Sequence, residues 1–515
     1  MKKIGLLIVI LFWICSGCED ALNMKPENSL TYENGLTTPK DFESILNGIN
    51  RALQFNRTKS PVGRAHVRKG EYADEWSEGS IDWSRTLNYP SSSSGRGENM
   101  ESWASYYPCI ISANIVLNYV DIADLPEEYH ALYKGQALFY KALAYFEIIQ
   151  RWGDCVLIRD ELELFPVEKA SWDEVATYTI GLTEKAIELL PEFDKLKDAN
   201  GNDVTYKTVP CKGAANALLA YLCAWKAGCK YFARDAGYDE MELWRMAENA
   251  CSRIIDSDVY SLANTPEEVC TSVLVGDSKE SIYEFVVKGF WNENDIGTAN
   301  PGDDYFGYPV LDWFPLDFMD QCNLRLKATS MIKMFPRGDL RGEAYFYELY
   351  SLSEDPEANG YACLYKYRQH YIHTNESGDL VYEGVDQNQI LWRLADIYLL
   401  RAECRARLGG EYISGAIDDL NEIRDRARAK RYEISEYNGD LRYTIFKERE
   451  KELLIEGHRY WDIIRNGYVR TELVGNFKTL TDQDIKDGAL FLMIDASSFT
   501  GNPLLRQNTY WFRKL

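Results

Sequence analysis

Apolar residues recur at helical spacing along most of this 515-residue chain, and this spacing restricts it to a mainly helical fold. In "QALFYKALAYFEIIQRWGD", the apolar side chains between Leu138 and Trp152 follow one another at steps of four and three, so they lie on one face of a helix. Gly153 comes next and predicts the end of that helix. Similar spacing predicts helices at 41–54, 100–120, 171–190, 211–230, 242–256, 388–408, 414–430 and 441–465.

Several of these helices form pairs that resemble one another. The run "LWRLADIYLLRAECRARLGGEYISGAIDDLNEIRDRARA" predicts a helix, a Gly-Gly turn and a second helix, and "KGAANALLAYLCAWKAG" followed by "WRMAENACSRIID" repeats the plan. Small residues let neighbouring helices approach closely, and a helix with apolar or small residues on two sides must be covered on both. We therefore expect tetratricopeptide-like stacking.

Two stretches, 59–99 and 257–385, break the helical pattern. The second contains the strand-like runs "ESIYEFVVKGFWN" and "NGYACLYKYR", and both contain loops punctuated by Gly and Pro. The aromatic residues of these loops follow no period, so a buried face does not readily explain them. The predicted fold class is mainly α: a tetratricopeptide-like helical scaffold with an irregular, loop-rich ligand-binding half that contains a few short strands.

The N-terminus has the anatomy of a secretory signal peptide, with a basic start and the apolar run Ile4–Ile14, which is too short to span a bilayer. The small pair ahead of Cys18 resembles a lipobox, which predicts removal of residues 1–17 and lipidation of Cys18. The two acids after Cys18 resemble the signal that sends some Gram-negative lipoproteins to the outer face of the outer membrane. The alternative is a soluble secreted protein cleaved nearby.

The acidic composition narrows the possible partners. A formal net charge of -23 argues against nucleic acid and against electrostatic binding to anionic lipid, so lipid must supply the attachment. Beyond the leader we expect no transmembrane helix. The ten cysteines from Cys109 to Cys404 are scattered and lie mostly in helical runs, so we expect buried apolar side chains rather than disulfides or metal ligands.

The strongest enzymatic candidate is the carboxylate pair Glu452 and Glu456, one helical turn apart, which could imitate a retaining glycosidase. Arginines three residues from these and nearby carboxylates predict ion pairs along the helix itself and lowered carboxylate pKa values, opposite to what a general acid needs. Phe446, Leu453 and Tyr460 recur every seven residues as a buried stripe. We expect no enzyme, no metal and no cofactor.

The same stretch, "EREKELLIEGHRYWDIIRNG", together with "RLADIYLLRAEC", "AIDDLNEIRDRAR" and "NPLLRQN", closely resembles the C-terminal signature of the SusD/RagB family of outer-membrane nutrient-binding lipoproteins. "ALFYKALAYFEIIQRWGDCVLI" and "SLTYENGLTTPKDFESILNGI" resemble earlier segments of that family. The resemblance implies a helical scaffold with a ligand-binding half, and a SusC-like TonB-dependent barrel as partner, over which the lipoprotein sits as a lid.

With this resemblance, the expected organisation is a signal peptide at 1–17, a lipid-anchored tether at 18–40 and a body at 41–515. The scaffold is expected mainly at 41–58, 100–256 and 386–467, and the ligand-binding loops mainly at 59–99 and 257–385.

Glycan-binding members of the family hold ligand with exposed aromatic residues and a few polar groups. A sugar ring packs its C–H face on a flat aromatic side chain, while its hydroxyl groups need fixed hydrogen-bond partners. Asp74, in "ADE", matches a family position; the others are candidates by composition, and local packing of the aromatics is the alternative. The candidate platforms are Trp76, Trp83, Trp291, Tyr305, Tyr308 and Trp313, and the candidate hydrogen-bond partners are Asp74 and Arg85.

The resulting hypothesis is a non-catalytic lipoprotein at the cell surface that captures an oligosaccharide and passes it to a SusC-like transporter in the outer membrane. Two alternatives remain, an oligopeptide-binding protein and a lid that only gates the transporter. Loops vary freely on such a scaffold, so the resemblance names no sugar and no linkage.

Overall fold

The computed structural model describes residues 35–58, 70, 74–79, 100–160, 165–287, 324–352, 354 and 358–515. The predicted signal peptide, Cys18 and most of the predicted tether lie outside these residues.

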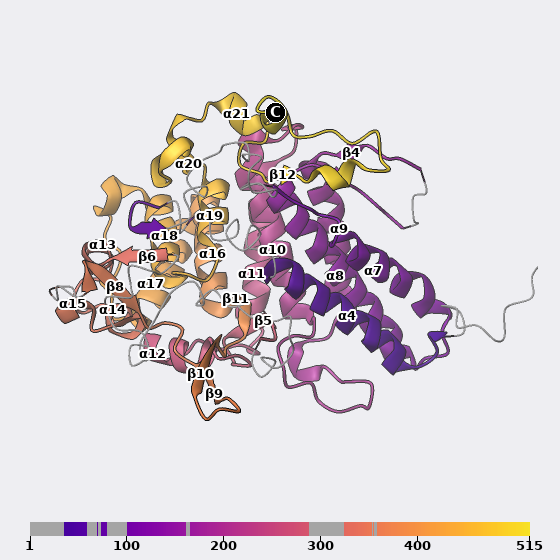
Figure 1. Cartoon of the computed structure of the whole chain (residues 1–515), viewed down its shortest axis with the longest axis horizontal. Helices are drawn as coiled ribbons and strands as arrows, with labels where there is room; N and C mark the ends of the chain where they lie inside the picture. Colours follow the sequence, from indigo (N-terminus) through magenta and orange to yellow (C-terminus); the bar gives the residue numbers. More distant parts are fainter. Residues whose placement is uncertain are drawn as a thin grey trace, which may run out of the picture.

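Long helices pack side by side in chain order and form the larger part of the protein (Figure 1). They are α4 (Pro39–Thr58), α7 (Tyr107–Tyr119), α8 (Glu127–Trp152), α9 (Trp172–Leu189), α10 (Lys212–Gly228) and α11 (Glu240–Ile255). Helix α8 is buried along most of its length because α4, α7 and α9 all pack on it, and α10 is buried between α9 and α11. These contacts confirm the expectation that helices rich in small residues are covered on more than one side.

The end of α8 shows why a glycine stands there. Gly153 has a φ of 73°, and its N–H donates to the carbonyl oxygen of Ile149. A Cβ at this position would lie 2.7 Å from the ring of Phe491. The predicted end of the helix is confirmed, and Gly153 also lets the C-terminal part of the chain pack closely against it.

The C-terminal helices depart from two of the sequence predictions. The run expected at 388–408 begins as strand β11 (Gln389–Arg393) and becomes helical only at α16 (Leu394–Leu408), which packs on α17 (Tyr412–Arg426). The run expected at 441–465 is two helices, α18 (Leu441–Glu452) and α19 (Arg459–Asn466). The chain turns between them, with positive φ values of 65° at Ile455 and 85° at Gly457.

The remaining half of the fold contains short strands. Strands β1 (Ser77–Gly79), β6 (Leu324–Lys327), β8 (Tyr361–Leu364) and β7 (Phe346–Tyr347) form a four-stranded antiparallel sheet in this order. Strand β5 (Ser281–Phe285) pairs with β11, and β9 (His370–Thr374) forms a hairpin with β10 (Leu380–Val385) that projects at the lower edge of Figure 1. The predicted mainly α class with a few short strands is confirmed.

Shorter elements connect these parts. They are β2 (Met100–Glu101), β3 (Cys155–Val156), β4 (Lys169–Ala170), α12 (Pro266–Glu268), α13 (Ala328–Met334), α14 (Arg341–Tyr345), α15 (Leu349–Leu352), α20 (Val469–Glu472), α21 (Asp482–Lys486), β12 (Met493–Ile494) and α22 (Thr509–Phe512).

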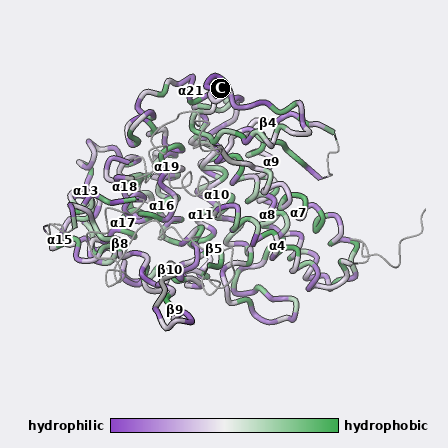
Figure 2. Tube along the Cα trace, in the orientation of Figure 1, coloured by the Kyte–Doolittle hydropathy of each residue, from purple (hydrophilic) through white to green (hydrophobic). Residues whose placement is uncertain are grey.

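The helical half and the sheet half have separate hydrophobic cores. The larger core lies among the helices, along which hydrophobic and hydrophilic residues are interspersed (Figure 2). The smaller core lies under the four-stranded sheet. Within the described part of the chain, no helix combines the length and apolar character needed to cross a membrane. The described cysteines are all buried, as expected: Cys109, Cys155, Cys211, Cys223, Cys229, Cys251, Cys270, Cys363 and Cys404.

Candidate ligand-binding site

Two of the eight candidate ligand-binding residues, Asp74 and Trp76, lie in the described part of the chain. Both belong to the short segment 74–79 that ends in β1. The other six lie outside the described residues, and their role stays a prediction: Trp83, Arg85, Trp291, Tyr305, Tyr308 and Trp313.

Trp76 is buried rather than exposed. Its side chain packs in the smaller core and only 5% of its surface is accessible. Its indole N–H donates to Glu450 Oε1 at 3.0 Å, and its carbonyl oxygen accepts from the N–H of Lys327 at 3.0 Å. A cavity that Trp76 helps to line has a volume of only about 10 Å³. The structure therefore differs from the expectation of an exposed platform: Trp76 anchors its segment to the sheet and to α18.

Asp74 is also buried, and an arginine from α19 holds it. Its Oδ2 accepts hydrogen bonds from Arg459 Nε at 3.1 Å and Arg459 Nη2 at 2.9 Å. The backbone of Asp74 forms an isolated antiparallel bridge with Leu473. In the described structure Asp74 thus fixes the base of the segment 74–79, and contact with a ligand stays a prediction.

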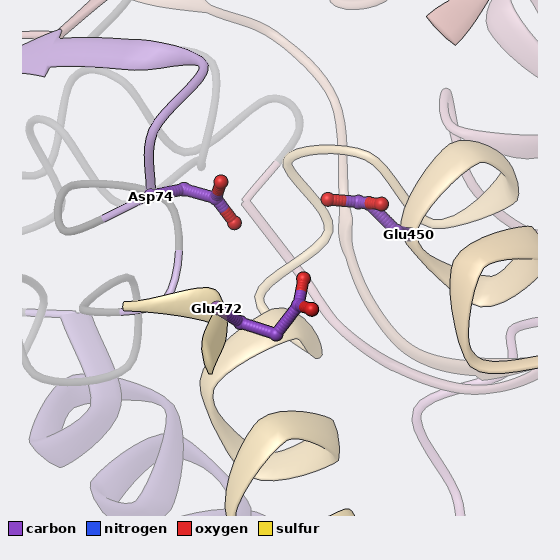
Figure 3. Close-up of side chains that lie close together, drawn as sticks. All are labelled: Asp74, Glu450 and Glu472. Carbon is purple, nitrogen blue, oxygen red and sulfur yellow. The ribbon is translucent and has the colours of Figure 1, made fainter. Parts of the chain in front are cut away.

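Asp74 is one of three buried carboxylates that point toward one another, with Glu450 of α18 and Glu472 of α20 (Figure 3). One oxygen from each lies within 4.8 Å of the others, and we call this group the carboxylate cluster. Carboxylates so close together repel one another unless a cation lies among them. Arg459 Nη2 supplies that cation, at 2.9 Å from Asp74, 2.9 Å from Glu450 and 2.7 Å from Glu472.

The carboxylate cluster has the donor atoms that a hard metal ion prefers, but its charge is already largely compensated. Arg459 occupies the centre, and Lys447 pairs with both Glu450 and Glu472, at 3.3 Å from the latter. Burial raises the pKa of Asp74 to about 6 against the opposing effect of Arg459, and Glu450 adds to the rise. The three carboxylates, of which Asp74 is the one most easily protonated, and the two cations therefore form a structural ion-pair network rather than a metal site.

A second set of buried charges surrounds Glu452 and Glu456. Glu452 pairs with Arg393 at 2.9 Å and with Arg341 at 3.3 Å. Glu456 pairs with Lys366 at 2.6 Å and with Arg393 at 2.7 Å. These cations come from other parts of the fold, so the expectation that the charges pair along their own helix is wrong for both carboxylates.

The turn between α18 and α19 explains this difference for Glu456, which lies in the turn. Arg449 and Glu452 both lie in α18, but Arg449 pairs with other carboxylates. Of the predicted pairs three residues apart, Asp462 with Arg465 is formed, at 2.7 Å, and it lies within α19. Arg449, at the other side of the turn, pairs with Asp462 at 2.8 Å and with Asp396 of α16 at 2.9 Å. Because the helix does not continue through residues 453–458, side chains three apart do not share a face there.

The electrostatic argument against a glycosidase pair is confirmed. Burial alone would raise the pKa of Glu456, but Arg393 and Lys366 outweigh it and lower that pKa to about 2. Burial also opposes the shift at Glu452, where Arg426, Arg393 and Arg341 hold the pKa far below its usual range. Both groups stay ionised at neutral pH, whereas a glycosidase needs one carboxyl with a raised pKa.

Arg341, Lys366 and Arg393 were not singled out from the sequence. Arg393 did carry a signal, because it interrupts the apolar run "ILWRLA", where a charged residue needs a buried partner. Arg341 and Lys366 lie in the irregular stretch 257–385, where no such signal marks them.

The chain is similar to known protein families and to individual proteins over most of its length. One family model, described as "SusD family", matches residues 307–511, and another, described as "Starch-binding associating with outer membrane", matches residues 21–222. A SusD-like protein of Formosa agariphila is 25% identical, with 99% of each chain covered, and a second one is 23% identical, with 90% of each covered.

Solved structures share the fold over nearly the whole chain. A SusD homolog from Bacteroides thetaiotaomicron superposes with a TM-score of 0.74 at 21% identity, covering 92% of this chain and 98% of that one. A laminarin-binding SusD-like protein superposes with a TM-score of 0.66 at 19% identity, covering 92% and 99%.

Proposed function

Because the chain belongs to the SusD/RagB family, we propose that it is a non-catalytic lipoprotein of the cell surface that captures an oligosaccharide and passes it to a SusC-like TonB-dependent transporter. The family model for residues 21–222 is described by starch binding and outer-membrane association, and one structural relative by laminarin binding. These descriptions support a carbohydrate as ligand.

The observation that carries the proposal is the register of β1 and β6. Gly79 at the end of β1 stands directly opposite Leu324 at the start of β6. The segment 80–99 therefore begins where the segment 288–323 ends, although the two are far apart in the sequence. Five aromatic candidates and Arg85 lie on these segments, with Trp83 four residues from Gly79, a span of at most about 14 Å.

Binding by these residues fits the physics of sugar recognition. Flat aromatic side chains can pack on the C–H faces of sugar rings, and Arg85 can donate several hydrogen bonds to hydroxyl groups. The buried contacts of Asp74 and Trp76 hold the base from which segment 80–99 starts.

Isothermal titration of the leaderless protein against neutral plant, microbial and host-type oligosaccharides tests capture. We expect one class to bind, and Trp83→Ala or Trp291→Ala to weaken it about tenfold, which is about 1.4 kcal/mol. Tyr206→Ala, at a half-exposed tyrosine outside both segments, is the control and leaves the affinity unchanged. If no oligosaccharide of the panel binds, the proposal of glycan capture is wrong, and the oligopeptide-binding or gating alternatives are favoured.

The anchor and the partner need separate tests. We expect the wild type, but not Cys18→Ala, to incorporate radiolabelled palmitate and to be released from intact cells by external protease. Co-purification of the tagged wild type with a TonB-dependent barrel would support the transporter partner, and recovery of the protein alone from gently solubilised membranes would contradict it.

A further inference from the structure

The connection between α17 and α18 follows a left-handed backbone path. Tyr437, Asn438 and Gly439 have φ values of 45°, 59° and 85°, so three consecutive residues lie in the left-handed region. Tyrosine is uncommon there, asparagine is one of the few side chains that tolerate this region, and glycine adopts it without strain. The path therefore explains why asparagine and glycine follow one another at this place.

The same dipeptide is chemically labile. Because glycine has no Cβ, its backbone nitrogen can approach the side-chain amide of the preceding asparagine closely enough to attack it. Only accessible and loosely held pairs can rotate into the geometry that this attack needs. The sequence contains six Asn-Gly pairs, of which five lie within the described residues: Asn47-Gly48, Asn200-Gly201, Asn359-Gly360, Asn438-Gly439 and Asn466-Gly467.

Asn438 is exposed and loosely held. No described residue forms a hydrogen bond with its side-chain amide, and its neighbours Tyr437 and Gly439 are exposed as well. The turn around it is closed by a long hydrogen bond, in which the N–H of Asp440 donates to the carbonyl oxygen of Tyr437 at 3.3 Å. Two side chains other than glycine in the left-handed region add strain, which favours local opening.

Asn466 has the same glycine neighbour but is held firmly. Its amide nitrogen donates to Glu403 Oε1 at 3.2 Å and to the carbonyl oxygen of Asp462 at 3.0 Å. Its amide oxygen accepts from Arg407 Nη2 at 2.6 Å. These hydrogen bonds must break before the amide can turn toward Gly467, so Asn466 is an internal comparison for Asn438.

The other described pairs are held through their backbone. Asn47 lies inside α4, where the helix fixes the chain. The N–H of Gly201 donates to the carbonyl oxygen of Asp198 at 2.9 Å. The carbonyl oxygen of Gly360 accepts from the N–H of Ala328 at 2.8 Å, next to the four-stranded sheet. Each of these pairs has shorter bonds to break than the turn at Asn438.

We propose that Asn438 is a site of spontaneous deamidation. The backbone nitrogen of Gly439 forms a bond to Cγ of Asn438, the Cγ–Nδ2 bond breaks, and the amide nitrogen leaves as ammonia with the proton of the Gly439 N–H. Water then opens the resulting succinimide ring. Opening at Cγ gives aspartate, and opening at the main-chain carbonyl carbon gives isoaspartate, in which the main chain is longer by one methylene group.

The extra methylene group of isoaspartate would fall between two fixed points. Before it, both carboxylate oxygens of Glu436 accept from Arg424, at 2.9 Å and 3.0 Å. After it, the side chain of Asp440 caps α18 by accepting from the N–H of Tyr443 at 3.0 Å. A longer chain displaces one of these contacts, and loss of a helix cap is destabilising. We therefore expect isoaspartate to loosen the start of α18.

Incubation of the full leaderless chain at mildly alkaline pH, followed by peptide mapping by mass spectrometry, tests the proposal. We expect conversion at Asn438 to be at least about tenfold faster than at Asn466, because the hydrogen bonds at Asn466 must break first. In the chain unfolded by guanidinium the two sites should convert at similar rates. This control separates the effect of the folded structure from that of the dipeptide.

A parallel incubation of Asn438→Gly measures the consequence. This variant keeps a residue that tolerates the left-handed path but has no amide to react. We expect the melting temperature of the wild type to fall during incubation as isoaspartate accumulates, and that of Asn438→Gly to fall less.

The proposal would be overturned if Asn438 stayed intact while another described pair converted, or if Asn438 and Asn466 converted equally fast in the folded chain. Equal losses of melting temperature in the wild type and in Asn438→Gly would overturn the predicted effect on α18. These results do not depend on whether the protein binds a glycan, so they test this inference separately from the proposed function.

Discussion

Replacing Glu456 by Gln tests the buried ion pairs that join the helical half to the sheet half. Lys366 Nζ lies 2.6 Å from Glu456 Oε1, and Arg393 donates to both carboxylate oxygens, at 2.8 Å and 2.7 Å. All three side chains are at most 4% exposed. Glutamine keeps the shape of the side chain and removes its charge.

The pKa of Glu456 gives the size of the effect. Burial works against ionisation, yet Arg393 and Lys366 lower the pKa from 4.5 to about 2. At 1.36 kcal/mol per pKa unit, this corresponds to about 3 kcal/mol of stability at neutral pH. Because the folded-state pKa lies below the unfolded one, the contribution is fully present above about pH 4.5 and is lost as the pH falls toward 2.

Guanidinium unfolding followed by tryptophan fluorescence, at pH 7 and at pH 3, measures this difference. We expect Glu456→Gln to lower the free energy of unfolding by about 3 kcal/mol at pH 7 and by distinctly less at pH 3. Glu174→Gln is the control, since Glu174 pairs with Arg159 at 3.3 Å with both side chains about half exposed. An exposed pair of this kind contributes at most about 1 kcal/mol.

The reasoning would be refuted if Glu456→Gln cost no more than Glu174→Gln at pH 7. It would also be refuted if its cost were the same at both pH values, because a loss that does not depend on pH would come from packing rather than from the ionised carboxylate.

Two further predictions concern single residues. In Gly153→Ala, alanine must adopt a positive φ and its Cβ lies 2.7 Å from Phe491, so we expect the protein to lose about 1–3 kcal/mol of stability in thermal melts. Gly181→Ala, which has open space inside α9, is the control and should not destabilise the protein. Equal melting temperatures of the two variants would contradict this expectation. Burial raises the pKa of Asp74 to about 6, so the wild type should gain stability over Asp74→Asn as the pH falls from 7.5 to 5; a gain with rising pH instead would show that the pKa is lowered.

Helix α8 was predictable because its signal is local. Apolar residues at steps of four and three and the glycine after Trp152 are all within one run of sequence, and the structure places the helix and its end there. The strand character of residues 281–285 and 361–364 was visible for the same reason, since their content alone indicates strands.

The break between α18 and α19 was not predictable from spacing. Phe446, Leu453 and Tyr460 are all buried, as a seven-residue repeat predicts, but they are buried on both sides of a turn. The turn depends on Ile455 at a φ of 65°, unusual for a β-branched residue, whose carbonyl oxygen accepts from the Tyr367 hydroxyl at 3.1 Å. That contact comes from a distant segment, so no local pattern contains it.

The burial of Trp76 was missed for a related reason. Strand β1 is three residues long, too short to show alternation of buried and exposed positions, and its partner β6 follows only after helices α7 to α11. The aromatic residues follow no period in the sequence, which predicted an exposed side chain for Trp76. The structure shows instead that the element beside it is too short to have a period. The remaining candidates on segments 80–99 and 288–323 keep their status as predictions.

Buried ion pairs connect the stretch 448–467 to the sheet half. Arg341 pairs with Glu448 at 2.7 Å, Lys366 with Glu456, and Asp74 with Arg459, so three charged residues of the sheet half are held by one stretch of the helical half. Apolar contacts alone are not directional and would tolerate sliding between the halves, whereas a buried ion pair that loses its partner is strongly destabilised. The pairs therefore select a single arrangement of the two halves. Because that arrangement includes the segment 74–79, it also fixes the point from which the proposed ligand-binding segments emerge, whatever sugar they bind.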